Sequence, residues 1–343
     1  MKGRWRLLLV LPVLAIATVL IIYRGPNWHL VHDAFTAVTW EWVVAAIGLN
    51  LISVLLRAFA WETTIKQSIP RPHPPFPLVF SAFSVGLFAN AVLPGRVGEL
   101  ARVAVLRRRI PGQRGTTATL VGSVFAHRMF DLIPALTLVI WVIFAAKIPG
   151  WALTSIAVVL AVGVILFLAA IWLARRQNRE RDELGRIRLL FIRGREGLAI
   201  MRTPAAAATA ALFQFGGWVC QLFAVWATMH AFNIHLPLAA AGLVLVLINV
   251  ATIFPLWPGN VGLVQAAVAI PLVNYGVGKA HGIAFGIGLQ AIEASVGVGV
   301  GLIFLAREGL SYATLRDIED DPSEGSAELH EPEAPADRAR VSG

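Results

Sequence analysis

The sequence predicts an all-α polytopic membrane protein, with about six full spans and two broken or re-entrant hairpins in an inverted-repeat arrangement. Of its 343 residues, 57% are hydrophobic and only 14% are charged, and apolar runs of membrane-spanning length recur along the chain. This composition excludes an ordinary soluble enzyme. The hairpins are predicted from a phrase that interrupts two apolar runs, reading PGRVG at residues 94–98 and PGNVG at residues 258–262.

The full spans follow from the apolar runs in chain order. The first run, residues 7–22, follows three basic residues and is similar to a signal peptide, but we expect an uncleaved helix because its only small-residue cleavage pattern lies inside the run. Pro134 is expected to kink the long third span. The spans after the first are expected at residues 42–59, 116–146, 151–174, 204–229 and 282–306.

The two interrupted segments, residues 78–106 and 238–275, carry the clearest functional signal. Proline and glycine end one helix and begin another, and a membrane tolerates such a break only where protein or water satisfies the freed backbone groups. Broken segments at matching places in two halves are the best sequence indication of a transporter's binding site near the bilayer midplane.

Loop charge predicts how these segments are oriented. Arginines cluster at residues 107–114 and in the loop 175–203, where nine Arg stand against four Asp or Glu, and basic loops face the cytoplasm. Both termini are then cytoplasmic, the first hairpin enters from the cytoplasm and the second enters from the outside. Residues 42–146 and 204–306 would therefore be inverted repeats, an architecture that lets one site open alternately to each side.

The membrane domain is expected to cover residues 1–315, and the residues after it differ in composition. Residues 316–343 contain nine acidic residues and almost no large apolar side chain, so we expect a disordered cytoplasmic tail that is able to recruit a cytoplasmic partner. The basic residues of the chain lie in short loops between apolar runs. This placement indicates membrane topology and attraction to anionic lipids, and it argues against nucleic-acid binding.

Charged residues inside apolar sequence are the candidate site. A charge at the centre of a membrane helix costs at least about 2.5 kcal/mol, so such groups are usually paired or line a pathway. Arg96 and Glu99 lie three residues apart, as do Arg128 and Asp131, which would allow neutralising pairs on one helix face. The alternative is that these pairs are merely structural. The candidate binding residues are these charges and one residue of the second break, namely Arg96, Glu99, Arg102, Arg128, Asp131, Asn260 and Glu293.

The helix breaks predict what these charges bind. A helix that begins just after either Pro-Gly pair directs free backbone N–H groups and the positive end of its dipole into the membrane interior, which suits an anion. Arg96 and Arg128 would add positive charge, and a guanidinium group matches phosphate with two hydrogen bonds. Because the surroundings are apolar, the expected ligand has an anionic headgroup and hydrocarbon tails.

The run LPGRVGELARVAVL, the following HRMFDL and the later PGNVG resemble the lysylphosphatidylglycerol synthase transmembrane region, or flippase-like domain family, over most of residues 5–306. The resemblance implies a multi-pass bacterial or archaeal protein that moves lipids or lipid-linked molecules between leaflets. Many members have a second Gly and a later Glu where this chain has Asn260 and Gln265. The positions that match the family are Pro94, Gly95, Arg96, Gly98, Glu99, Arg102, Arg128, Asp131, Pro258, Gly259 and Gly262.

We therefore expect a flippase-like transporter of the bacterial inner membrane, with no catalytic residue, metal or cofactor. Its expected ligand is an anionic phospholipid, a polyprenyl-linked lipid or, by likeness to the hopanoid-associated branch of the family, a hopanoid. Aminoacyl transfer to a lipid would need a large soluble domain, and the loop 175–203 and the tail are too short to fold one. Two alternatives stay open: an intramembrane lipid-modifying enzyme, and a non-transporting scaffold in lipid or hopanoid metabolism.

Overall fold

All the elements that the computed structural model describes are helices, which confirms the predicted all-α class. The described residues are 27–69, 71–93, 97–110, 116–148, 203–253 and 260–307, with the single residues 150, 154 and 200. Apart from residues 154, 200 and 203, the expectations for residues 7–22, 151–174, 175–203 and 316–343 fall outside these ranges. The helices are α2 (Trp28–Thr36), α3 (Trp40–Ser68), α4 (Phe76–Val92), α5 (Gly98–Arg109), α6 (Thr116–Ala145), α9 (Pro204–Ala231), α10 (Leu238–Ala251), α11 (Leu263–Val273) and α12 (Lys279–Arg307).

Four of the described helices, α3, α6, α9 and α12, are long and apolar enough to cross a membrane. Each has 28 to 30 residues, and at about 1.5 Å per residue this exceeds the hydrocarbon core of about 30 Å. The chain is thus a multi-pass membrane protein. The predicted end of the span at residue 59 was wrong, because α3 continues to Ser68 with Trp61 and Ile65 fully buried against the rest of the protein.

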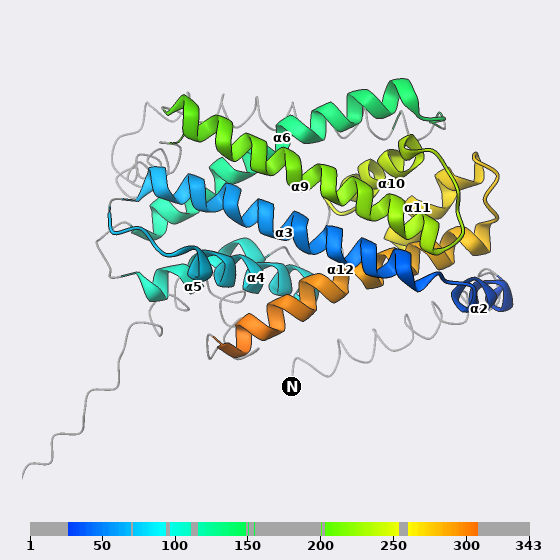
Figure 1. The fold of residues 1–343 in the computed structure, drawn as a ribbon, viewed down its shortest axis with the longest axis horizontal. Coiled ribbons are helices and arrows are strands. Elements are labelled where there is room, and N and C mark those ends of the chain that lie inside the picture. The colour runs from blue at the N-terminus through cyan, green and yellow to red at the C-terminus, as the bar shows by residue number, and fades with distance from the viewer. Residues whose placement is uncertain are drawn as a thin grey trace, which may run out of the picture.

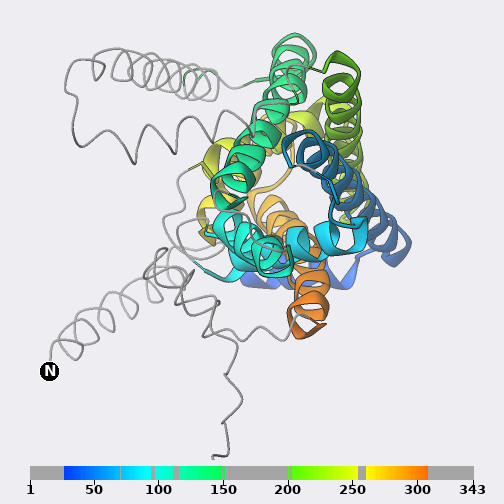
Figure 2. The same ribbon diagram turned by 90° about the vertical axis from the view of Figure 1, so that its left-hand side faces the viewer.

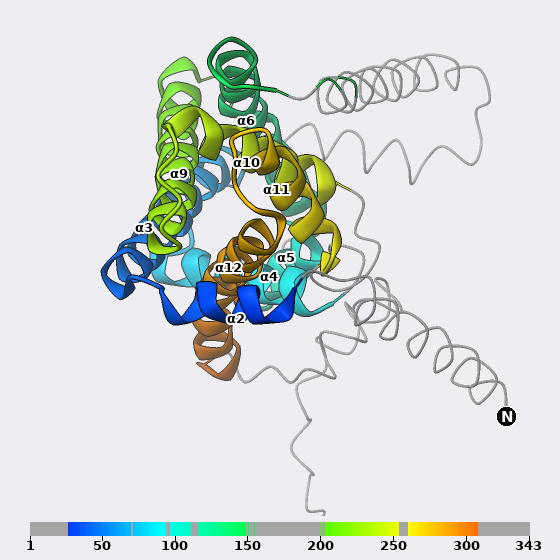
Figure 3. The same cartoon turned by 90° about the vertical axis from the view of Figure 1, so that its right-hand side faces the viewer.

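The short helix α2 is an element that the sequence analysis did not predict. The side chain of Asn27 accepts a hydrogen bond from the backbone N–H of His29 over 3.1 Å and caps the helix. Helix α2 packs against α12, and Figure 3 shows it crossing the end of the bundle.

The two halves of the described chain repeat one order of elements: a long helix, two short helices and a second long helix. Helices α4 and α5 have 17 and 12 residues, and α10 and α11 have 14 and 11. All four are shorter than the roughly 20 residues that a full span needs. The first long helices, α3 and α9, lie side by side (Figure 1), while α4 packs against α12 and α10 against α6. Each hairpin therefore contacts the last long helix of the other half. Figure 2 shows this arrangement from one end of the bundle.

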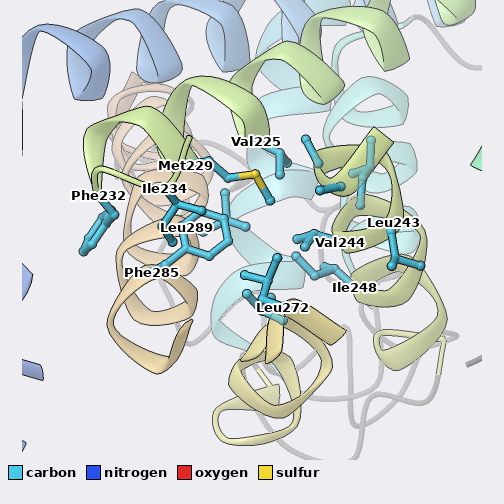
Figure 4. Packing of buried hydrophobic residues seen from close by; sticks show 14 of the residues in the cluster. Val225, Met229, Phe232, Ile234, Leu243, Val244, Ile248, Leu272, Phe285 and Leu289 are labelled. Atoms are coloured by element: carbon cyan, nitrogen blue, oxygen red, sulfur yellow. The ribbon is translucent and has the colours of Figure 1, made fainter. Parts of the chain in front are cut away.

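The hydrophobic core is divided between the two hairpins. One cluster joins α10 and α11 to the nearby ends of α9 and α12, with Met229, Leu243, Leu272, Phe285 and Leu289 in its interior (Figure 4). The other joins α4 and α5 to the second half of α3 and the last part of α12. Helices α3, α6 and α12 contribute to both clusters, whereas α9 contributes to the first but not to the second.

Candidate functional site

A polar cavity of about 200 Å³ lies at the middle of the long helices. This is far more than the roughly 15 Å³ that one water molecule needs. Glu293, for example, is the central residue of the 29-residue helix α12. The cavity is lined from α3, α4, α5, α6, α9 and α12, so both halves of the chain contribute to it. Its polar and charged lining residues are Asn50, Ser53, Arg57, Asn90, Glu99, Arg102, His127, Arg128, Gln221 and Glu293.

Arg128 and Glu99 form the centre of an ion-pair network between α6 and α5. Arg128 donates from Nε to Glu99 Oε1 over 2.6 Å, and its Nη2 bonds the same oxygen. Its Nη1 donates to Asp131 Oδ2 over 3.1 Å, and Arg102 Nη2 lies 3.3 Å from Glu99 Oε2. Glu99 thus holds two arginines, and Arg128 holds two carboxylates. The structure brings together four of the predicted site residues.

Asp131 also ties this network to the other half of the chain. The indole Nε1 of Trp218, on α9, donates to Asp131 Oδ1 over 2.9 Å, and the amide of Gln214 donates to the same oxygen. Gln214 is fully buried. Neither α9 residue could be identified as a site residue from sequence, since a Trp or Gln inside an apolar run has no distinctive spacing.

Arg102 is the most deeply buried charge of the network, with only 4% of its surface exposed. Its guanidinium carbon lies 4.8 Å from the ring centre of Trp61 and 5.6 Å from that of Phe83. These aromatic faces stabilise a cation in a place where water cannot. Within the described part of the chain its Nε has no hydrogen-bond partner, so this side chain has an unused donor.

Arg57 of α3 is a cavity residue that the sequence analysis missed. Its Nη2 donates to Gln221 Oε1 over 2.5 Å, and Gln221 is in turn hydrogen-bonded to the Glu293 carboxyl group. The guanidinium carbon lies 5.4 Å from the ring centre of Trp218, and Nε again lacks a partner among the described residues. The predicted span ended at residue 59, which placed Arg57 at the membrane surface; the longer α3 places it at the middle.

The first hairpin closes through a contact between two glycines. A Cβ on Gly98 would lie 2.0 Å from the carbonyl oxygen of Gly86, which no side chain permits. The Gly98 N–H donates to Asn90 Oδ1 over 2.9 Å, so a side chain of α4 caps the start of α5. This contact brings two residues to the cavity wall: Glu99, which follows Gly98 directly, and Arg102, which lies one helical turn after Gly98.

The second hairpin is built differently. Gly262 has φ +91°, a conformation that glycine adopts without strain, and its N–H donates to Gln265 Oε1 over 2.5 Å. Gln265 Nε2 donates to Gln290 Oε1 on α12 over 2.6 Å. Asn260 is buried just before this turn and has φ 45°, but it is not among the residues that line the central cavity. Gln265 also lies apart from that cavity.

The described cavity network therefore contains three guanidinium groups and three carboxyl groups, from Arg57, Arg102, Arg128, Glu99, Asp131 and Glu293. Two of the guanidinium groups have an Nε donor without a hydrogen-bond partner in the described part of the chain. In the described ranges, no three His, Cys, Asp or Glu side chains gather in a way that could hold a metal ion. The predicted residues Pro94, Gly95, Arg96, Pro258 and Gly259 lie outside the described residues.

Comparison with known proteins identifies the family. The model of the lysylphosphatidylglycerol synthase TM region matches residues 5–301 of this chain. A UPF0104 membrane protein of Methanothermobacter thermautotrophicus is 22% identical over 299 residues, covering 79% of this chain and 85% of that protein. Another, from Methanocaldococcus jannaschii, is 22% identical over 188 residues, covering 53% of this chain and 77% of that protein. No solved structure matches the chain. The protein belongs to the lysylphosphatidylglycerol synthase transmembrane-region family.

Proposed function

We propose that this protein binds the anionic headgroup of a membrane lipid in the central cavity and moves the lipid between leaflets. The observation that carries the proposal is the position of Arg57, Arg102 and Arg128 around one cavity midway along the spanning helices. Ionised groups at this depth are costly and are usually kept for binding or passage. The proposal is a transporter and not an enzyme, with an anionic phospholipid, a polyprenyl-linked lipid or a hopanoid derivative as its cargo.

A phosphate group is the headgroup chemistry that best fits these arginines. A guanidinium group donates two parallel hydrogen bonds to phosphate oxygens, and charge-assisted bonds of this kind are about twice as strong as neutral ones. The Nε groups of Arg57 and Arg102 are buried and have no hydrogen-bond partner among the described residues, so the protein does not use all the donors of these two side chains. When the cavity holds no anion, Glu99 and Asp131 balance the charge of Arg128 and keep it in place.

The arrangement of the hairpins supports movement as well as binding. Because the hairpin arms are too short to cross the membrane, we infer that each hairpin enters and leaves on one side. Contacts of α4 with α12 and of α10 with α6 link each hairpin to the opposite half. We further propose that residues 42–146 and 204–306 are related by a pseudo-two-fold axis in the membrane plane, so that rocking of the halves exposes the cavity to each side in turn.

We propose that the protein lies in the bacterial inner membrane. Charge at the end of a helix supports one orientation of the chain in that membrane. Three arginines, Arg107, Arg108 and Arg109, occupy the last turn of α5, and positively charged ends favour the cytoplasm. With this end inside, both termini are cytoplasmic. A partner for the acidic tail remains a prediction.

Transport is tested with purified full-length protein in proteoliposomes that contain a fluorescent phosphatidylglycerol. Chemical quenching of the outer leaflet reports the fraction of lipid that has changed sides. Arg128→Ala is expected to slow this exchange at least tenfold, while Lys66→Ala, which removes an ion pair with the buried Glu62 outside the cavity lining, should leave it unchanged. Exchange by Arg128→Ala at the rate of the unaltered protein would contradict the proposal.

A further inference from the structure

An apolar groove of about 280 Å³ lies between α6 and α9, beside the charged cavity but distinct from it. Its walls include Pro134, Leu138 and Trp141 of α6 and Phe215, Leu222 and Phe223 of α9. Three wall residues carry polar side-chain groups, Thr137, Trp141 and Trp218, and two of these groups are bonded within the protein. The Thr137 hydroxyl donates to the carbonyl of Ile133 over 2.9 Å, and the Trp218 indole N–H donates to Asp131. The groove therefore offers water few polar partners.

Trp218 joins the groove to the arginine cavity. Its ring forms part of the groove wall, its Nε1 bonds Asp131, which is paired with Arg128, and the guanidinium group of Arg57 lies over it at 5.4 Å. A molecule that extends from the cavity into the groove would therefore pass from charged to apolar surroundings across one side chain. A phospholipid changes in the same way between its phosphate and its acyl chain.

We propose that the groove between α6 and α9 binds one acyl chain of the lipid whose phosphate is bound by Arg57 and Arg128, with Trp218 at the junction of head and tail. The inference rests on the proposed lipid site and adds where the tail lies. Lipid is the occupant because α6 and α9 are membrane-spanning helices whose groove residues, such as Trp141, Phe215 and Phe223, are partly exposed at the protein surface. A tail anchored there would keep the lipid from leaving the protein while its headgroup is in the cavity.

The test uses a phosphatidylglycerol with a photoactivatable group in the middle of one acyl chain, bound to the full-length protein in nanodiscs. After illumination, the labelled residues are mapped by mass spectrometry. Labelling is expected at residues 134–141 and 215–223 and should be competed by excess unlabelled phosphatidylglycerol. A diacylglycerol with the same chain lacks the phosphate and should label these residues no more than other membrane-facing ones.

Two kinds of variant distinguish binding of the acyl chain in the groove from binding of the headgroup in the cavity. Leu222→Trp fills the groove and should lower this labelling roughly tenfold, the loss expected when about two methylene groups of the chain lose their burial. Val219→Trp, on the same wall, provides a second variant should the first fail to fold. Arg128→Gln, which leaves the groove intact, should lower the labelling by a similar factor because one lipid spans both sites.

The matched control fills a different groove. A larger apolar groove of about 630 Å³ lies among α2, α11 and α12 and has no arginine in its lining. Ile270→Trp fills that groove, and it should leave labelling of α6 and α9 unchanged. Labelling spread evenly over the membrane-facing helices, or insensitive to Arg128→Gln, would overturn the inference.

The labelling experiment and the lipid-exchange experiment test the two proposals independently. Labelling that depends on Arg128, in a protein that does not exchange lipid, would support the inference and contradict the transport proposal. Normal exchange by both groove variants, with normal labelling, would overturn the inference and leave transport standing.

Discussion

Asp131 of α6 and Trp218 of α9 are joined by a hydrogen bond of 2.9 Å from the indole Nε1 to the carboxylate. The bond connects helices from the two halves of the chain, and it fixes a carboxylate that also holds Arg128. The aromatic ring of Trp218 faces Arg57. One side chain thus positions two of the three cavity arginines, which makes it a sensitive place to test the site.

Trp218→Phe is expected to lower lipid affinity about tenfold, because Asp131 loses a donor and Arg128 loses part of its support. The free energy of unfolding should fall by about 1–2 kcal/mol, as for other lost buried hydrogen bonds. Both quantities are measurable, by titration with phosphatidylglycerol and by thermal unfolding in detergent. Trp226→Phe is the matched control, since it removes an indole bond of 3.3 Å to the Leu236 carbonyl, away from the cavity. Equal loss of affinity in both variants would show that the effect of Trp218 is general.

Gly98→Ala is expected to prevent the first hairpin from closing, because its Cβ would overlap the carbonyl oxygen of Gly86 and the side chain of Asn90. We expect a loss of more than about 3 kcal/mol, beyond ordinary overpacking. Gly48→Ala, in α3, meets open space and should be neutral or slightly stabilising. The yield of monodisperse protein and its thermal unfolding midpoint measure both. A well-folded Gly98→Ala with an unchanged midpoint would show that the two helices do not approach so closely.

The sequence predicted the helical class and the places where two helices break, because these depend on local properties: the length of apolar runs and the effects of proline and glycine. The family was predicted from the resemblance of its motifs. The family and the all-α class are confirmed. Polar contacts between distant residues were not predictable in the same way. Arg128 pairs with Asp131, three positions away, as the spacing predicted. Its other partner, Glu99, lies 29 positions away, and only the contact between α5 and α6 brings these two residues together.

The site residues that were not predicted share one feature: their role depends on contacts with other helices. Arg57 lies four residues before the fully buried Trp61, and the charged residues Glu62 and Lys66 that follow are typical of the end of a span. The structure pairs Glu62 with Lys66 at 2.9 Å, so these two charges are compatible with a longer helix. Gln214 and Gln221 were missed because a glutamine is tolerated in many apolar runs, and its function depends on what faces it.

The pair of Glu99 and Arg128 is expected to show strong coupling in a double-mutant cycle. Glu99→Gln alone leaves Arg102 without a carboxylate and Arg128 with Asp131 only, and should cost about 1.5–3 kcal/mol of unfolding free energy. Adding Arg128→Gln should recover part of that loss, which gives a coupling of at least about 1 kcal/mol. Thermal unfolding of the four proteins measures it. The control cycle at Glu62 and Lys66, where the lysine is exposed, the carboxylate is buried and neither lines the cavity, should give a smaller coupling; similar values in both cycles would contradict a special role for the cavity pair.

Glu293→Gln is expected to make lipid exchange insensitive to an imposed pH gradient while lipid binding is retained. Glu293 lies at the cavity wall and at the middle of α12, and Gln221 connects it to Arg57 of the other half. A carboxyl group in this position can take up a proton when Arg57 engages a lipid phosphate and release it when the arginine returns. Glutamine preserves the size and the hydrogen bonding but cannot exchange a proton. The measurement compares exchange rates in proteoliposomes with and without a gradient, using Glu62→Gln as the control that should keep the response. If the unaltered protein already ignores the gradient, Glu293 is structural and lipid concentration alone drives exchange.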